Sequence, residues 1–146
     1  MIHTATEDWI FPDWPAPANI RAVSTTRNGG VSAAPWNSMN PASHTEDDLA
    51  HVMQNRRILR QSGELPAEPL WLNQVHGNNV VDAARVEQNA RADGSFAYRA
   101  GVVCAVMTAD CLPVLLCDKY GRQVAALHAG WRGLAGGILE AGVACF

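Results

Sequence analysis

The sequence has little charge, and its pattern argues against a nucleic-acid or membrane partner. Charged residues make up 17% of the 146 positions, the net charge is −3, and the Lys and Arg residues form no basic stripe. Nucleic-acid binding therefore has no electrostatic support. The apolar runs stop well short of the roughly 20 residues of a membrane span. The first eight residues lack the charged and apolar regions of a secretory signal. We therefore expect no membrane partner and a cytoplasmic location.

The four cysteines form no CxxC pair, which argues against a four-cysteine zinc knuckle and a thioredoxin-type dithiol. Cys104 and Cys117 lie inside apolar runs, where a free cysteine packs as a small hydrophobic residue. The sequence thus favours a reducing compartment. Cys111 differs from both, because it follows Asp110 at a strand end, and Pro113 prevents backbone pairing there.

Hydropathy predicts one long helix in the first half of the chain. Thr45 can cap its beginning, with Asp48 three residues later, and Gly63 can end it. The apolar residues with helical spacing, which we expect to be buried, are Leu49, Val52, Met53 and Leu59.

The rest of the chain predicts strands and one final helix. We expect a turn at 118–121 and a polar surface excursion at 83–100. The expected strands are 20–26, 70–75, 79–82, 102–107, 114–117 and 123–127. Continuous rather than alternating hydrophobicity is typical of strands buried on both faces in layered α/β proteins. The last helix is expected to begin near Gly130 and to continue to the end of the chain.

Three short motifs each place a metal-ligating side chain at the end of an apolar run. They are Gln-Val-His-Gly at 74–77, Ala-Asp-Cys-Leu-Pro at 109–113 and His-Ala-Gly-Trp-Arg-Gly at 128–133. Their ligands are His76, Cys111 and His128. Three protein ligands leave a fourth tetrahedral position open, which is typical of catalytic rather than structural zinc. The other histidines, at 3, 44 and 51, are scattered and show no such pattern.

Cys111 also admits a second interpretation, as a nucleophile whose pKa is lowered by a nearby imidazole. Metal ligation and nucleophilic attack need the same sulfur, and two converging histidines favour the metal. Asp110 is a candidate to orient a ligand or a water. Arg132, in the first turn of the expected last helix, and Arg27 are candidates to grip phosphate.

With these motifs, the sequence resembles the YfiH family, also labelled DUF152, laccase-domain proteins, polyphenol oxidases and peptidoglycan editing factors. The resemblance runs through 24–32, 37–40, 47–48, 55–56, 73–77, 108–113 and 128–133. It implies a layered α/β (α+β) sandwich with mixed β-sheets, distantly similar to cysteine-hydrolase toxins. It further implies a single domain over 1–146 that is incomplete at its C-terminus, since family members usually continue into further strands.

The resemblance also implies a function and a set of site residues. A zinc ion would be bound by His76, Cys111 and His128. The expected activities are phosphorolysis of adenosine, inosine and methylthioadenosine, and deamination of adenosine. Candidate catalytic residues are Cys111, Asp110 and Arg27, and candidates for binding substrate or phosphate are Arg27, Arg132 and Asn40.

Three other functions stay open from the sequence. Two histidines and one cysteine are also the ligands of a blue-copper centre, with Met107 as an axial candidate, which would suit a copper-dependent phenol oxidase. A multicopper laccase, however, needs a further histidine-rich cluster. The editing-factor label alone implies hydrolysis of a cell-wall precursor amide. A non-catalytic binding module is the third alternative.

Overall fold

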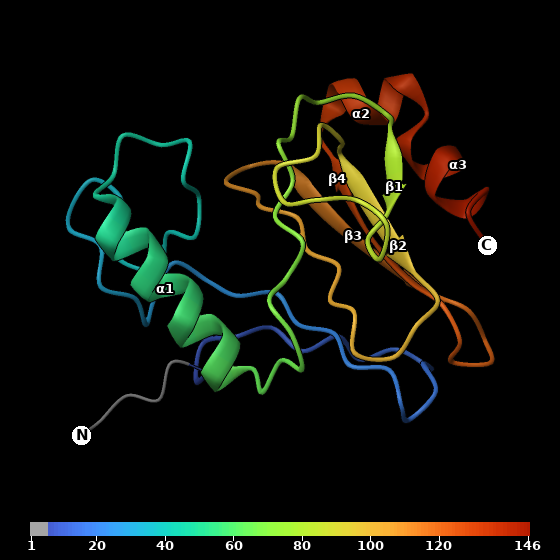
Figure 1. Cartoon of the computed structure of the whole chain (residues 1–146), viewed down its shortest axis with the longest axis horizontal. Helices are drawn as coiled ribbons and strands as arrows, with labels where there is room; N and C mark the ends of the chain where they lie inside the picture. Colours follow the sequence, from blue (N-terminus) through green and yellow to red (C-terminus); the bar gives the residue numbers. More distant parts are fainter. Residues whose placement is uncertain (1–5) are drawn as a thin grey trace. The chain divides into compact units, whose positions relative to one another are not determined.

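The computed structural model describes residues 6–146, which form two compact units. Among these residues, the first unit comprises 6–14 and 22–65, and the second comprises Pro15–Arg21 and Pro66–Phe146. Helices, strands and loops are traced in Figure 1. No helix within residues 6–146 is both long enough and apolar enough to cross a membrane.

The first unit is built around the helix α1 (Leu49–Ser62). The prediction of this helix is confirmed, and Gly63 ends it by donating its N–H to the carbonyl of Leu59 at 2.9 Å. The predicted start was wrong. Asp48 is the cap and accepts from the N–H of Ala50 at 2.8 Å, whereas the Thr45 hydroxyl donates to the carbonyl of Ala42 in the preceding loop.

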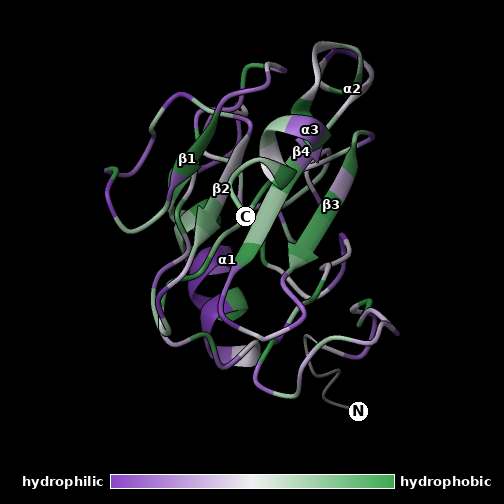
Figure 2. Cartoon of the chain, turned by 90° about the vertical axis from the view of Figure 1, so that its right-hand side faces the viewer, coloured by the Kyte–Doolittle hydropathy of each residue, from purple (hydrophilic) through white to green (hydrophobic). Residues whose placement is uncertain are grey.

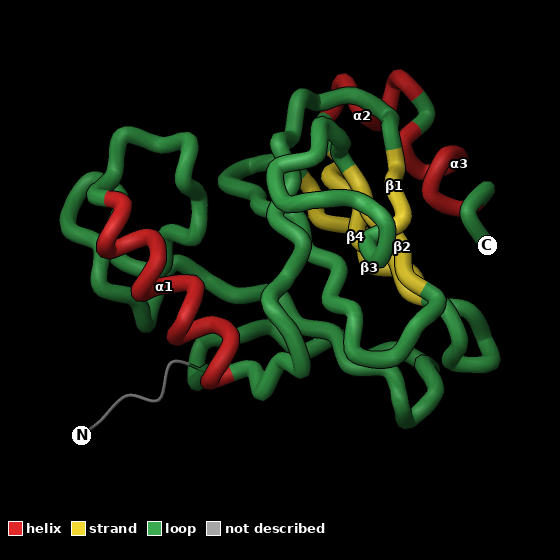
Figure 3. The backbone as a smooth tube through the Cα atoms, viewed as in Figure 1, coloured by secondary structure: helices red, strands yellow, loops and turns green. Residues whose placement is uncertain are grey.

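The buried face of α1 is narrower than the sequence predicts. Val52 is buried, but Leu49 and Met53 are 61% and 46% exposed, and Figure 2 shows the helix as largely hydrophilic. Asn55 occupies the buried position instead. Its side chain accepts from the N–H of Val31 and donates to the Ser32 hydroxyl and the Asn40 carbonyl. The helix therefore packs against the surrounding loops through polar contacts. Loops make up most of this unit (Figure 3).

The strand predicted at 20–26 is wrong. This segment forms only an isolated antiparallel bridge between Ile10 and Ser24, with two backbone hydrogen bonds. The predicted strands at 70–75 and 102–107 are also reduced to bridges, in which Leu70 pairs with Cys104 and Asn73 with Arg91. In each case a hydrophobic run packs as extended chain without a continuous ladder.

The second unit contains one four-stranded sheet. Its strands are β1 (Val80–Asp82), β2 (Gly94–Ala97), β3 (Leu112–Cys117) and β4 (Val124–Ala129), in the spatial order β1-β2-β4-β3. β1 and β2 are parallel, whereas the other neighbours are antiparallel. The sheet is therefore mixed, which confirms the predicted α/β class.

The sequence misplaced one strand of this sheet. β2 lies inside 83–100, the stretch expected to be a polar surface excursion, yet it pairs with β1 on one side and β4 on the other. Its short run Gly-Ser-Phe-Ala carries too little hydrophobicity to be recognised, although three of the four residues are buried. The turn between β3 and β4 is confirmed, because Asp118 donates its N–H to the carbonyl of Gln123.

Two short helices replace the single final helix that was predicted. They are α2 (Trp131–Gly136) and α3 (Ile138–Val143), separated by Gly137 with a φ of 89°. This left-handed backbone suits glycine and breaks the helix. Both helices contact β4, and the fully buried Leu127 and Ile138 join α3 to the sheet in one core.

Candidate metal centre

Three segments of the second unit bring His76, Cys111 and His128 together. His76 lies in a turn after the 70–75 segment, Cys111 directly precedes β3, and His128 lies within β4. Their ligand atoms all lie within 4.8 Å of one another. The two imidazole rings meet edge to face, with centroids 4.7 Å apart. The structure thus places side by side the three side chains that the sequence singled out, and we call them the triad.

The β3–β4 ladder explains how two members of the triad meet. Pro113 is paired with His128 and Leu112 with Ala129. The residue before β3, Cys111, therefore lies next to the residue after β4, Gly130. A Cβ built on Gly130 would lie 2.7 Å from the Cys111 sulfur and 3.4 Å from the His76 Cδ2. Only glycine leaves the room that the thiol and the imidazole occupy here.

Asp93 fixes the third segment. Its buried carboxylate accepts the backbone N–H groups of Val75, His76 and Gly77, at 2.7 to 3.2 Å. These contacts hold the turn in which His76 adopts a φ of 61°, a left-handed conformation that non-glycine residues seldom adopt. The same carboxylate lies 2.9 Å from the Nδ1 of His128, which is also buried.

The electrostatics of Asp93 follow from these contacts. Burial raises the pKa of its carboxyl, but the hydrogen bonds from His128 and from the backbone of Gly77, Val75 and His76 outweigh that effect. The pKa of Asp93 is therefore held below its usual value, and the group is an anion at neutral pH. As a carboxylate it can only accept, so the Nδ1 of His128 carries a proton, and in the neutral imidazole the lone pair is then on Nε2.

The pKa of the Cys111 thiol is shifted in the other direction, above its usual value. Burial raises the pKa of its thiol, and the carboxylates of Asp110 and Asp93 raise it further. Nucleophilic cysteines have lowered pKa values because a cation or helix N-terminus lies beside them. The raised pKa favours the protonated thiol, whereas a cation bound at the triad would favour its thiolate.

Gln74 links the segment of His76 to the segment of Cys111. Its side-chain amide donates to the carbonyl of Met107 at 2.7 Å and accepts from the N–H of Met107, also at 2.7 Å. The amide thus imitates one rung of a β-ladder between two chains that form no continuous strand. Met107 was a candidate axial copper ligand. In the structure, its backbone N–H and carbonyl bond to the side chain of Gln74.

The triad fits a zinc ion by its chemistry and by its spacing. Zinc binds imidazole nitrogen at about 2.0 Å and thiolate sulfur at about 2.3 Å, which requires donors about 3.5 Å apart in a tetrahedron. The observed limit of 4.8 Å leaves a small closing movement, for which the exposed His76 is suited. With Nδ1 of His128 held by Asp93, the remaining nitrogen is available to a metal.

The other predicted site residues of the second unit lie beside the triad in sequence. Asp110 is exposed and acts on the Cys111 thiol, so it is placed to influence that ligand. Arg132 is exposed on α2, and its guanidinium lies 5.1 Å from the centroid of the Trp131 ring. A role of Arg132 in binding phosphate stays a prediction.

Arg27 and Asn40 belong to the first unit. The Arg27 guanidinium donates to the backbone carbonyl and side chain of Asn37, at 2.8 and 3.4 Å. The Asn40 amide donates to Thr45 and Asp47, while its oxygen accepts the N–H of Ala42. These contacts give Asn40 a structural role in its own loop, and substrate contacts by either residue stay predictions.

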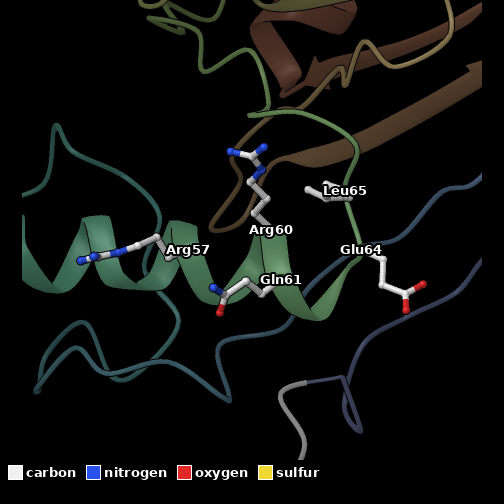
Figure 4. A pocket seen from close by; sticks show the side chains of 5 residues that line it. All are labelled: Arg57, Arg60, Gln61, Glu64 and Leu65. Carbon is white, nitrogen blue, oxygen red and sulfur yellow. The ribbon is translucent and has the colours of Figure 1, made fainter.

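Other features of the chain have weaker chemistry. His3 lies outside the described residues, and within residues 6–146 the triad is the one cluster of three or more histidine, cysteine or acidic residues suited to a metal. A surface hollow of about 500 Å³ lies at the end of α1. Its two arginines project in different directions (Figure 4). The hollow is lined by Arg57, Arg60, Gln61, Glu64 and Leu65.

Sequence reasoning missed Asp93 and Gln74. Asp93 lies in the stretch interpreted as a surface excursion, with no motif around it. Gln74 was visible inside the Gln-Val-His-Gly motif, but the pattern of one sequence does not reveal that its amide pairs with a backbone 33 residues away.

Comparison with known proteins assigns the chain to a family. Residues 21–146 match the family described as multi-copper polyphenol oxidoreductase laccase. The chain belongs to this family. A Pseudomonas aeruginosa protein named purine nucleoside phosphorylase is 56% identical over 92% of this chain and 54% of its own length. An Escherichia coli protein named purine nucleoside phosphorylase YfiH is 51% identical over 94% of this chain and 57% of its own.

Solved structures of the family agree with the fold. A crystal structure of a Neisseria meningitidis protein of the DUF152 family has a TM-score of 0.90 and 48% identity, covering 95% of this chain and 57% of that one. The resemblance to the YfiH family is thereby confirmed. The chain spans about half the length of the curated relatives it matches.

Proposed function

We propose that the triad is the zinc site of an enzyme that acts on purine nucleosides. The proposed reactions are phosphorolysis of adenosine, inosine and methylthioadenosine, and deamination of adenosine. The observation that carries the proposal is the convergence of His76, Cys111 and His128 within 4.8 Å. The names of the relatives, purine nucleoside phosphorylase, supply the substrate class.

The proposal assigns catalysis to the open position of the triad. Zinc held by three protein ligands keeps a fourth position for water or substrate, where it acts as a Lewis acid. His128 enters that set with a fixed ring orientation, because Asp93 holds its Nδ1 at 2.9 Å. Asp110, exposed beside Cys111, is the proposed group to orient a water or a substrate hydroxyl there.

Each proposed reaction makes and breaks defined bonds. In phosphorolysis, a phosphate oxygen bonds to the ribose C1′ while the C1′–N bond breaks, and the base leaves with a proton. In deamination, water adds at C6 of adenine and ammonia leaves. Arg27 or Arg132 is the proposed phosphate partner, since guanidinium pairs with phosphate through two parallel hydrogen bonds.

Incubating the protein with adenosine, with and without phosphate, tests the proposal. Adenine and ribose 1-phosphate are expected only with phosphate, and inosine in both samples. Cys111→Ala should abolish both reactions. The matched control Cys145→Ala should leave them unchanged, because it removes a thiol outside the triad, whose sulfur donates to the carbonyl of Ala141 in α3. Products that persist in Cys111→Ala at the wild-type rate would contradict the assignment.

A copper-dependent oxidase of phenols is the second candidate, favoured by the description of the family. The triad supplies the imidazole and thiolate ligands of a mononuclear copper site. Copper bound by a thiolate gives a strong visible absorption band, which zinc does not. Metal analysis of protein purified without an affinity tag, followed by its visible spectrum, therefore separates the two candidates.

A further inference from the structure

Asp93 touches the segments of both histidines of the triad. One of its oxygens lies 2.8 Å from the backbone N of His76 and 2.9 Å from the Nδ1 of His128. The other accepts the N–H of Gly77 at 2.7 Å. The carboxylate is fully buried, and its own backbone carbonyl accepts the N–H of His128 at 2.7 Å.

We infer that Asp93 is the positioning residue of the metal site, setting the backbone of one histidine ligand and the tautomer of the other. This inference rests on the proposed metal site. Asp93 touches no substrate and no metal itself. It acts through His76, whose left-handed turn it holds with backbone hydrogen bonds, and through His128, whose proton it keeps on Nδ1.

Burial of the Asp93 carboxylate keeps its hydrogen-bond donors in place. A buried carboxylate without partners is strongly destabilising, so its donors must remain in place as long as the protein is folded. The turn at 75–77 and the ring of His128 are among those donors. The backbone of His76 and the ring of His128 are therefore held before a metal arrives, which lowers the cost of ordering them on binding.

Replacing the carboxylate by an amide distinguishes this role. In Asp93→Asn, one oxygen becomes an NH2 group that cannot accept. If the NH2 takes the place of the oxygen on the Gly77 side, the N–H of Gly77 loses its acceptor and the turn that carries His76 is weakened. If it faces His128, the ring must accept at Nδ1 and place its proton on Nε2, the nitrogen required by the metal. Either orientation disturbs one ligand.

Asp82→Asn is a matched control. Asp82 is a carboxylate of β1 in the same unit, accepts from the N–H of Ala84 at 2.9 Å and pairs with Arg85 at 3.1 Å. Its side chain is 12% exposed. This variant loses hydrogen bonds of a similar kind without any contact to the triad.

The test measures zinc affinity by competition with a chromogenic chelator and the histidine tautomers by 15N NMR. We expect wild type to bind one zinc, Asp93→Asn to bind about 10–100-fold more weakly, and Asp82→Asn to stay within threefold of wild type. In metal-free wild type, His128 should carry its proton on Nδ1. That second measurement needs no variant, so it stands even where Asp93→Asn fails to fold.

The outcomes separate the two proposals. Wild type that binds no zinc overturns the metal site itself. Wild type that binds zinc while a folded Asp93→Asn binds within threefold of it overturns only the role of Asp93. A neutral His128 in metal-free wild type that carries its proton on Nε2 and none on Nδ1 overturns that role as well.

Discussion

Gly130→Ala should destroy zinc binding while leaving the fold intact. The added Cβ would lie 2.7 Å from the Cys111 sulfur, about 1 Å inside the usual contact distance. The backbone itself accepts alanine, because Gly130 has a φ of −66° and a ψ of 167°, which is ordinary extended backbone. The perturbation is therefore steric and falls on a proposed metal ligand.

The sulfur has a simple way to relieve this overlap. Rotation about χ1 to another staggered position moves it by about 3 Å, which removes it from the triad. Overpacking costs about 1–3 kcal/mol, and the lower entropy of the unfolded alanine chain offsets about 0.4–1 kcal/mol of it. We expect the melting temperature of the apoprotein to fall by no more than about 8 °C.

Zinc affinity should change far more than stability. Loss of a ligand exceeds the loss of an outer partner, for which about 10–100-fold is typical, so we expect more than about 100-fold weaker binding. Titration with a competing chelator measures this change, and thermal unfolding of the same apo sample measures stability.

Gly136→Ala is the matched control. An added Cβ at this glycine of α2 meets no atom within 4 Å, and the Gly136 carbonyl that accepts from Asn78 is unaffected. Alanine is the better helix former, so its stability should rise or stay equal and its zinc affinity should match wild type. A folded Gly130→Ala protein that binds zinc as tightly as this control would refute the reasoning.

Three further predictions concern the second unit. Gln74→Ala should lower the free energy of unfolding by about 1–3 kcal/mol in urea titration, because it leaves the Met107 N–H and carbonyl without their partner; an unchanged midpoint would contradict this. Burial raises the pKa of Asp118, but hydrogen bonds from Arg122 and Gln123 outweigh it and hold that pKa below its usual value. The ionised Asp118 therefore stabilises the fold fully above its pKa in the unfolded chain, and this stabilisation is lost as pH falls through its pKa in the folded protein. When unfolding is followed against decreasing pH, Asp118→Asn should not show that loss of stability. Burial raises the pKa of Cys104 to about 11, so mass spectrometry should find that iodoacetamide modifies it more slowly at pH 8 than it modifies a free thiol in a short peptide.

The site was more predictable from sequence than the sheet that carries it. His76 and His128 were recognisable because each follows an apolar run and shortly precedes a glycine, and Cys111 because it follows Asp110 at a strand end, shortly before Pro113. Local spacing holds that information. Whether the three meet depends on the β3–β4 register, in which Pro113 is paired with His128, and that register is a tertiary property.

The strands show where local patterns fail. Residues 102–107 are apolar throughout and 70–75 contain four apolar side chains, yet both segments form only bridges, since a strand also needs a neighbour with matching backbone. β2 has the neighbours and little hydrophobicity. Its glycine, Gly94, is required by packing, because a Cβ there would lie 2.7 Å from the Leu127 side chain.

The position of β2 also explains why Asp93 could not be found. Asp93 directly precedes β2 and lies 35 residues from His128 in sequence. It reaches His128 because β2 pairs with β4 in the antiparallel register Gly94–Leu127, which places Asp93, the residue before β2, opposite His128 within β4. It reaches His76 because the turn at 75–77 closes over the same end of β2. A single carboxylate at this corner of the sheet therefore joins two ligand segments that are 52 residues apart, and only the fold makes it part of the site.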